Sequence, residues 1–281
     1  MTRKTGSVLA SSAVKIITPA PGAGGKTPMM RRQLALCLCL AALMAAGQSR
    51  ALEVKDLSFY APFDGSLNAA FASGAVAARV GEKQIPFVPG IAGQAVQLGE
   101  PKLSLSYAVS NNIGERQGSI SMWVKPLWAD WMTEHYFITI SQNQPTGRSD
   151  SIPLDNRMSI WYSRNFCVCF TTPLWQLADY PCPFPDKKAE FHHIVITWGN
   201  GKSIRYGDGK FQAQIDLTGK LPPWDANNSQ FEMGKAVTSD DRMAIDELMI
   251  FNRPLDATEA NNLYRQVSNK LKRQGGGRLA G

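Results

Sequence analysis

Hydrophobic and polar side chains alternate in three short runs between Phe191 and Ile215. These runs are rich in β-branched and aromatic residues, and two dipeptides that tolerate positive φ, Asn200-Gly201 and Asp208-Gly209, separate them. Such dipeptides between alternating apolar runs are the strongest short-range signal for a β-hairpin. The pattern therefore predicts three consecutive antiparallel strands, which the rest of the chain should join or face.

The same alternation recurs along most of the chain, and one element of a different kind follows it. A short helix is expected to begin at Leu255, run through Tyr264 and fray into a basic tail. The segments 67–90, 142–153 and 172–189 are polar or rich in Gly and Pro, and we expect loops there. Many short strands at regular spacing predict an all-β antiparallel sandwich or jelly roll. The predicted strands are 57–63, 94–98, 103–107, 119–124, 136–141, 157–163, 166–171, 231–234 and 243–251.

The N-terminal segment is expected to be a signal peptide rather than part of the fold. Met30-Arg31-Arg32 precedes an apolar run over 34–47, and small residues at Ser49 and Ala51 suit a signal peptidase. A membrane span is less favoured, because a span needs roughly 20 apolar residues. We therefore expect residues 1–51 to be an N-terminal extension plus signal, cleaved after Ala51, and the protein to be secreted, periplasmic or at the cell surface.

Removal of residues 1–51 changes the charge balance. The whole chain has 30 Lys and Arg and 23 Asp and Glu, and the first 51 residues hold seven of the basic residues and none of the acidic ones. The remaining chain is neutral, with four of its basic residues in the last twelve. The high isoelectric point is therefore no evidence for nucleic acid or an anionic membrane as partner. We expect one domain over 52–266 and a disordered basic tail over 267–281.

Three cysteines remain after signal cleavage: Cys167, Cys169 and Cys182. An exported chain meets an oxidising compartment, and an odd number of cysteines allows at most one internal disulfide. We expect Cys182 to pair with Cys169 or with Cys167, which would contribute on the order of 3 kcal/mol. A zinc site that adds His192 and His193 is disfavoured, because neighbouring strand residues point to opposite faces.

Several segments, taken in chain order, resemble the laminin-G-like, concanavalin A-like jelly-roll domains of bacterial secreted proteins. The resemblance covers about residues 57 to 265, and the ordered set is more specific than any one motif. It implies two curved sheets packed face to face, with the closing strand beside the opening one. The matching segments are Ser58–Leu67, Gly93–Leu98, Gly118–Pro126, Phe191–Trp198, Tyr206–Lys210 and Ala244–Leu255.

The resemblance also bears on catalysis and on metal binding. Glucanases of this fold carry a Glu-x-Asp-x-(x)-Glu strand, and no Glu-x-Asp occurs in this chain. We therefore expect no enzyme. In related domains an acidic residue near the opening strand and one near the closing strand help to hold a structural Ca²⁺, which implies Asp64 and Asp246 here. The alternative is that Asp64 is a turn residue and that Asp246 caps a buried backbone group.

Aromatic residues supply the remaining candidates for a binding site, because sugar faces stack on exposed rings. Trp128, Trp131 and Trp175 are expected to be exposed, with Tyr162 and Asn143 nearby, whereas three other tryptophans, Trp123, Trp161 and Trp198, are expected in the core. The first hypothesis is an exported, non-catalytic module that binds a glycan or a cell-surface ligand. The alternatives are a structural or adhesive protein–protein module and a divergent glycoside hydrolase.

Overall fold

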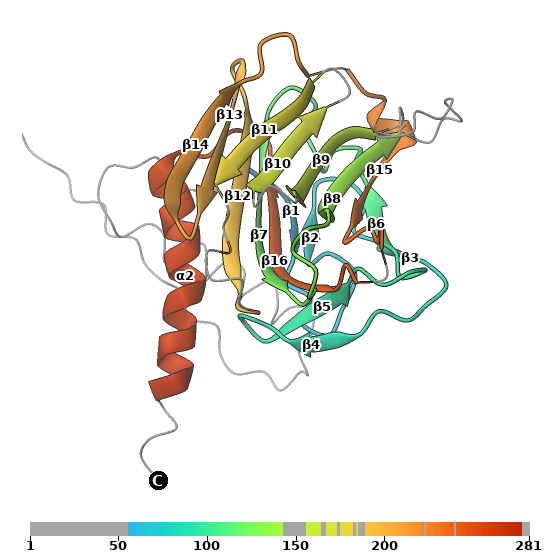
Figure 1. Cartoon of the computed structure of the whole chain (residues 1–281), viewed down its shortest axis with the longest axis vertical. Coiled ribbons are helices and arrows are strands. Elements are labelled where there is room, and N and C mark those ends of the chain that lie inside the picture. Colours follow the sequence, from blue (N-terminus) through green and yellow to red (C-terminus); the bar gives the residue numbers. More distant parts are fainter. Residues whose placement is uncertain are drawn as a thin grey trace, which may run out of the picture.

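The computed structural model describes residues 56–142, 156–163, 167–172, 175–181, 184, 189–221, 223–238 and 240–276. The predicted signal peptide and Asn143 lie outside these residues. The strands pair into two antiparallel sheets that lie face to face (Figure 1). One sheet has the order β14-β13-β12-β7-β16-β1-β2, with β5 and β4 attached beside β16, and the other has the order β11-β10-β9-β8-β15-β6-β3. The predicted jelly-roll sandwich is therefore confirmed.

The first sheet contains the strands that the sequence pattern predicts most strongly. The predicted three-strand meander is present as β12 to β14, with β12 paired to β7 on its other side. The closing strand β16 pairs with the opening strand β1, as the family resemblance implied. The strands of this sheet are β1 (Leu57–Ala61), β2 (Phe71–Ala72), β4 (Phe87–Pro89), β5 (Gln94–Leu98), β7 (Gly118–Pro126), β12 (His192–Gly199), β13 (Lys202–Gly207), β14 (Lys210–Asp216) and β16 (Met243–Phe251).

The second sheet contains the predicted strands 157–163 and 166–171 as β9 and β10, which pair with each other. Its strands are β3 (Arg79–Val80), β6 (Leu105–Ala108), β8 (His135–Gln142), β9 (Asn156–Ser163), β10 (Cys167–Thr172), β11 (Trp175–Pro181) and β15 (Ser229–Met233). A short 3₁₀ helix, η3 (Ala226–Asn228), leads into β15.

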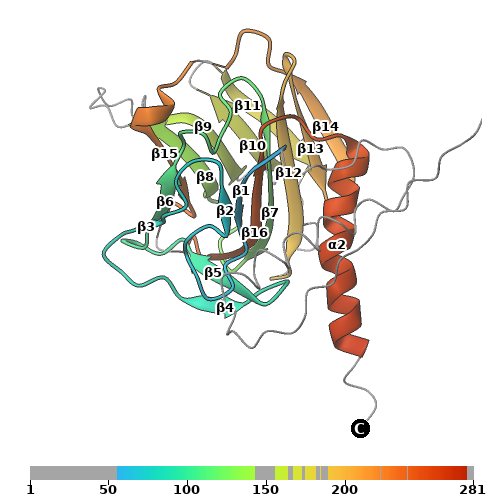
Figure 2. The ribbon, with the colours of Figure 1, turned by 180° about the vertical axis from the view of Figure 1, so that it is seen from behind.

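Alternation along the strands divides the side chains between two hydrophobic clusters. On β12, Ile194, Ile196 and Trp198 point between the sheets and belong to the main core. Val195 points to the outer face and packs with Leu263 of α2 (Ala257–Gly276). In Figures 1 and 2, α2 lies beside the sheet edge formed by β12 to β14 and extends past the end of the strands. Because successive side chains of a strand point to opposite faces, both faces of the sheet are buried at β12.

Three expectations about loops and ends are wrong. Short strands β2, β3 and β4 lie within 67–90, where loops were expected. The sequence does not reveal them because two or three residues are too few to show alternation. The expected loop over 172–189 contains β11, an edge strand that tolerates Pro181 at its end. The C-terminal helix continues to Gly276 rather than fraying after Tyr264. It is extended because an apolar stripe with helical spacing continues through Val267, which is buried.

Candidate functional site

The predicted exposed aromatic platform lies inside the fold. Trp128 is 4% exposed and Tyr162 is fully buried, so the exposure expected for Trp128 is wrong. Trp131 is half-buried, and its ring packs against both of the others. Strand β11 contains Trp175, but its side chain lies outside the described part. Trp128 and Tyr162 belong to the core between the sheets, and Trp131 packs against it, so these three rings do not form the expected exposed platform.

His135 and Asp241 form a buried pair beneath Trp128. Both side chains are fully buried, and His135 Nδ1 lies 2.8 Å from Asp241 Oδ1. His135 Nε2 lies 2.8 Å from the carbonyl oxygen of Asp130, and the imidazole stacks on the Trp128 indole with 4.0 Å between centroids. The two ring nitrogens therefore face a carboxylate oxygen and a carbonyl oxygen. Burial alone would raise the pKa of Asp241, but hydrogen bonds from His135 and from the 237–238 segment hold it below its ordinary value.

The two aspartates proposed as calcium ligands both bind the turn between β4 and β5. Asp246 Oδ2 accepts the backbone N–H of Ile91 at 2.8 Å and of Ala92 at 3.1 Å, and its Oδ1 accepts the N–H of Glu247. Asp64 Oδ1 accepts the N–H of Gln94 at 2.9 Å. These oxygens already satisfy buried or constrained donors, which matches the capping alternative. No group of three or more His, Cys, Asp or Glu side chains in the described part could hold a metal. Calcium stays a prediction.

Asp246 and His193 give the stability of the protein a defined pH dependence. Burial and the Glu247 carboxylate raise the pKa of Asp246 to about 8, although three N–H bonds oppose the rise. An unfolded Asp ionises near pH ~4, so stability falls as pH rises from about 4 to 8. Burial lowers the pKa of His193 to about 4, with Asp208 opposing. An unfolded His titrates near ~6.5, so this group makes stability rise between about pH 4 and 6.5.

Between about pH 4 and 6.5 the contributions of Asp246 and His193 to stability offset each other. Above pH 6.5 the contribution of Asp246 acts alone. We therefore expect the free energy of unfolding to fall by about 2 kcal/mol between pH 6.5 and 8. The Asp246→Asn variant should lose this decline, because an amide does not ionise. Urea denaturation at a series of pH values measures the free energy of unfolding of both proteins. A variant that keeps the full decline would show that another group causes it.

Ser121 and His193 resemble a nucleophile–base pair, but their surroundings do not support catalysis. Ser121 Oγ lies 2.8 Å from His193 Nε2, and both side chains are buried. Tyr264 of α2 lies over this region, stacked on Trp123 and tilted against the His193 ring. His193 Nδ1 has no hydrogen-bond partner among the described residues, so no third group orients the base. His192 instead binds Asp208 through Nδ1 at 2.9 Å. The rings of His193 and Trp123 instead pack helix α2 against the sheet through Tyr264.

The predicted disulfide lies partly outside the described residues. Strand β10 carries Cys167 and Cys169, which pair in register with Pro181 and Asp179 of β11. Cys182 itself is not among the described residues, so the disulfide stays a prediction. The described part of the chain contains no helix with both the length and the apolar character needed to cross a bilayer.

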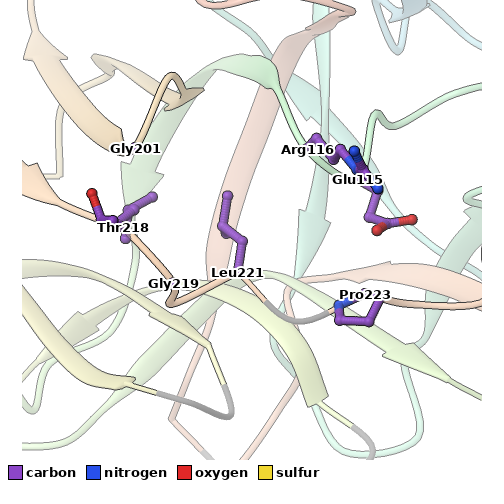
Figure 3. Close-up of a pocket in the computed structure, with 8 residues that line it drawn as sticks. Glu115, Arg116, Gly201, Thr218, Gly219, Leu221 and Pro223 are labelled. Carbon is purple, nitrogen blue, oxygen red and sulfur yellow. The ribbon is translucent and has the colours of Figure 1, made fainter.

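A pocket that the sequence reasoning missed opens at the end of the sandwich where β7 begins. Its volume is about 470 Å³, and it lies between the segment before β7, the β12–β13 turn and the segment after β14. Figure 3 shows Glu115 and Arg116 on one side, Thr218 on the other and Leu221 between them. The full lining comprises Glu115, Arg116, Gly201, Leu217, Thr218, Gly219, Leu221 and Pro223. A volume of this size is in the usual range of small-ligand sites, roughly 300–1,000 Å³.

Backbone and side-chain hydrogen bonds hold the wall of this pocket in place. The N–H of Leu217 donates to the carbonyl of Gly201 at 2.8 Å, which ties the segment after β14 to the β12–β13 turn. Thr218 Oγ1 donates to Asp216 Oδ1 at 2.8 Å, and Lys220 Nζ donates to the Asp216 carbonyl at 2.9 Å. The hydrogen bonds from Thr218 hold the pKa of Asp216 below its ordinary value. The wall is therefore pre-formed.

The opposite wall carries the charges. Arg116 is exposed and Glu115 is half-buried, and neither makes an ion pair or side-chain hydrogen bond within the described part of the chain. A carboxylate accepts hydrogen bonds and a guanidinium donates them, so adjacent Glu and Arg side chains can bind neighbouring hydroxyl groups. Among the residues around this pocket, the sequence pattern singled out only the Asn200-Gly201 turn, and it predicted a hairpin there and no binding site.

Comparisons with known proteins agree with the fold. Proteins of solved structure that are similar include a Trypanosoma rangeli sialidase mutant displaying trans-sialidase activity, with 12% identity and a TM-score of 0.60 over 86% of this chain and 38% of that one. The botulinum neurotoxin serotype D binding domain matches with 16% identity and a TM-score of 0.57 over 75% and 52% of the two chains. The receptor binding domain of botulinum neurotoxin type G matches with 15% identity and a TM-score of 0.56 over 74% and 50%.

These identities show a shared fold alone, and the chain spans only about 38% to 52% of the length of these proteins. No curated protein sequence matches the chain. A family model described as concanavalin A-like lectin/glucanases superfamily, of the laminin G type, matches residues 99–261, which is more than half of the chain. The protein therefore belongs to the concanavalin A-like lectin/glucanase superfamily.

Proposed function

We propose that the protein is an exported, non-catalytic binding module that takes a carbohydrate of one or two sugar rings in the pocket beside Glu115 and Arg116. The observation that carries the proposal is the pair of charged side chains without partners in the described part, placed on one wall of a pre-formed pocket. Leu221 and Pro223 supply apolar surface for the C–H face of a sugar, and Thr218 lies on the side opposite Glu115 and Arg116.

The composition of the pocket supports binding rather than hydrolysis. Glycoside hydrolysis uses two carboxyl groups across the scissile bond, roughly 5 to 10 Å apart. Glu115 is the one carboxylate among the described residues that line the pocket. Asp246 and Glu247 are adjacent acids elsewhere, but both are buried, and Asp246 binds the β4–β5 turn. Family membership adds support for a lectin-like role, although it does not name the ligand.

A glycan array probed with the full exported chain tests the proposal. Arrays run in CaCl₂ and in EDTA also test whether calcium contributes. We expect binding to a defined set of glycans. Arg116→Ala and Glu115→Gln should each weaken the affinity for a hit glycan by about fivefold, the size of one exposed charged hydrogen bond. Titration calorimetry measures the affinities.

Arg79→Ala and Glu82→Gln serve as matched controls, because both residues are exposed and neither lines the pocket. They should bind as well as the unmodified protein. A blank array under both conditions contradicts carbohydrate binding and favours a protein partner. Hits whose affinity is the same in all four variants would place the carbohydrate site elsewhere.

A further inference from the structure

A second hollow lies at the other end of β7. Its volume is about 240 Å³, and Met132, Thr133, Glu134, Val237 and Thr238 line it. These residues come from the segment between β7 and β8 and from the segment between β15 and β16. Strand β7 separates the two hollows in sequence, since Glu115 and Arg116 precede it and Met132 follows it. A ligand here would not compete with one beside Arg116.

Two of the five residues that line this hollow, Met132 and Val237, are large hydrophobic side chains exposed to solvent. Met132 is 61% exposed and Val237 is 58% exposed, and they belong to the small group of large hydrophobic residues in the described part that are exposed. They lie on different segments yet line one hollow. Single exposed apolar residues need no explanation, but two that line one hollow on a rigid base are a candidate contact surface.

The base is rigid because the two segments are joined by several hydrogen bonds. Asp240 Oδ2 accepts the N–H of Ala129 at 2.7 Å, and the buried His135–Asp241 pair forms a second connection. Asp241 also accepts the N–H groups of Val237 and Thr238. The positions of both apolar walls are thus set before any partner binds, which lowers the entropy cost of association.

The chemistry of the hollow fits one long basic side chain. Glu134 Oε2 accepts a hydrogen bond from Tyr136 at 3.3 Å, which leaves Oε1 available to a donor. The aliphatic stem of a Lys or Arg can pack between Met132 and Val237 while its charged head binds this carboxylate. Asp130 adds an exposed acid nearby, whereas Asp240 is partly compensated by Arg242 at 3.7 Å.

The chain itself contains a segment of complementary charge. From Lys270 onward it has four Lys and Arg residues and no acid. Helix α2 extends past the sheets in both views, so it directs this segment away from its own domain (Figures 1 and 2). We propose that the basic C-terminal segment 270–281 of one molecule docks in the Met132–Val237 hollow of a second copy, with a Lys or Arg at Glu134. Association through this end would leave the pocket beside Arg116 open.

Sedimentation velocity of the full chain over a concentration series tests this docking. We expect concentration-dependent self-association that weakens as salt is added, because the contact is ionic and exposed. Glu134→Lys should weaken association by about tenfold, since it replaces attraction with repulsion. A synthetic peptide of residues 268–281 should bind the full chain and compete with association. Glu82→Lys, an exposed acid outside both hollows, is the matched control and should associate normally.

A charge exchange distinguishes docking from a general charge effect. A variant with Lys270→Glu, Lys272→Glu and Arg273→Glu should fail to associate with itself but should associate with Glu134→Lys. The Arg116→Ala variant should associate normally, and Glu134→Lys should keep its glycan affinity, so the two proposals fail independently. A chain that stays monomeric at low salt, equal effects of Glu134→Lys and Glu82→Lys, or no rescue on mixing would each overturn the proposal.

Discussion

Replacing Asp241 with Ala is expected to lower the free energy of unfolding by about 3–5 kcal/mol, the usual cost of removing one partner from a buried polar network that contains a carboxylate. The carboxylate is fully buried and receives His135 Nδ1, two backbone N–H groups and the Thr238 hydroxyl, so the variant leaves several buried donors unsatisfied. Urea denaturation at neutral pH measures the loss. The Asp241→Ala substitution should also release the segment that contains Val237.

Asp240→Ala is the matched control for this variant. Asp240 is adjacent in sequence and also accepts two backbone N–H groups, but its side chain is 34% exposed. Water can replace its bonds, so we expect a loss of about 1 kcal/mol. A cycle with His135→Ala should show strong coupling to Asp241 and weak coupling to Asp240. Equal losses from Asp240→Ala and Asp241→Ala would contradict the importance assigned to burial.

Replacing Phe184 with Ala is expected to destabilise the protein by about 3–5 kcal/mol, because a fully enclosed ring leaves a cavity. Phe184 is 1% exposed, and its centroid lies 5.9 Å from that of Trp128 and 6.1 Å from those of Trp131 and Tyr162. Phe184 therefore packs within the aromatic cluster of the main core. Thermal or urea unfolding measures the effect.

Phe211→Ala removes the same ring from the surface, since Phe211 is 58% exposed. We expect a change within about 0.5 kcal/mol there. Phe184→Leu should recover most of the stability, because it refills most of the volume. If Phe184→Ala unfolds at the same urea concentration as Phe211→Ala, the packing of Phe184 in the aromatic cluster does not stabilise the protein as expected.

Trp128 shows why the binding site could not be predicted from the sequence. It follows Pro126 at the end of β7, outside any alternating run, so its sequence position does not say which way the ring points. Its burial depends on His135 and Phe184, which come from β8 and from a distant segment. Trp123, Trp161 and Trp198 lie on alternating strands, and all three are buried as predicted, although of the three only Trp198 belongs to the main core.

The pocket beside Glu115 and Arg116 could not be predicted from the sequence for the same reason. Its walls come from three segments that antiparallel pairing brings to one end of the sandwich. Nothing in the local sequence around Glu115 distinguishes it from an ordinary surface acid. The charged pair becomes a candidate site only because Thr218 lies opposite it, with Leu221 between them (Figure 3).

The sequence by itself determined the meander of β12 to β14, the closing strand and the jelly-roll class, because alternation and positive-φ turns are local properties of a strand. Tertiary structure decided which aromatic residues are exposed, where β11 and the end of α2 lie, and which side chains meet in the two hollows. These outcomes depend on contacts between segments far apart in the chain. A local pattern contains no information about them until the sheets close on each other.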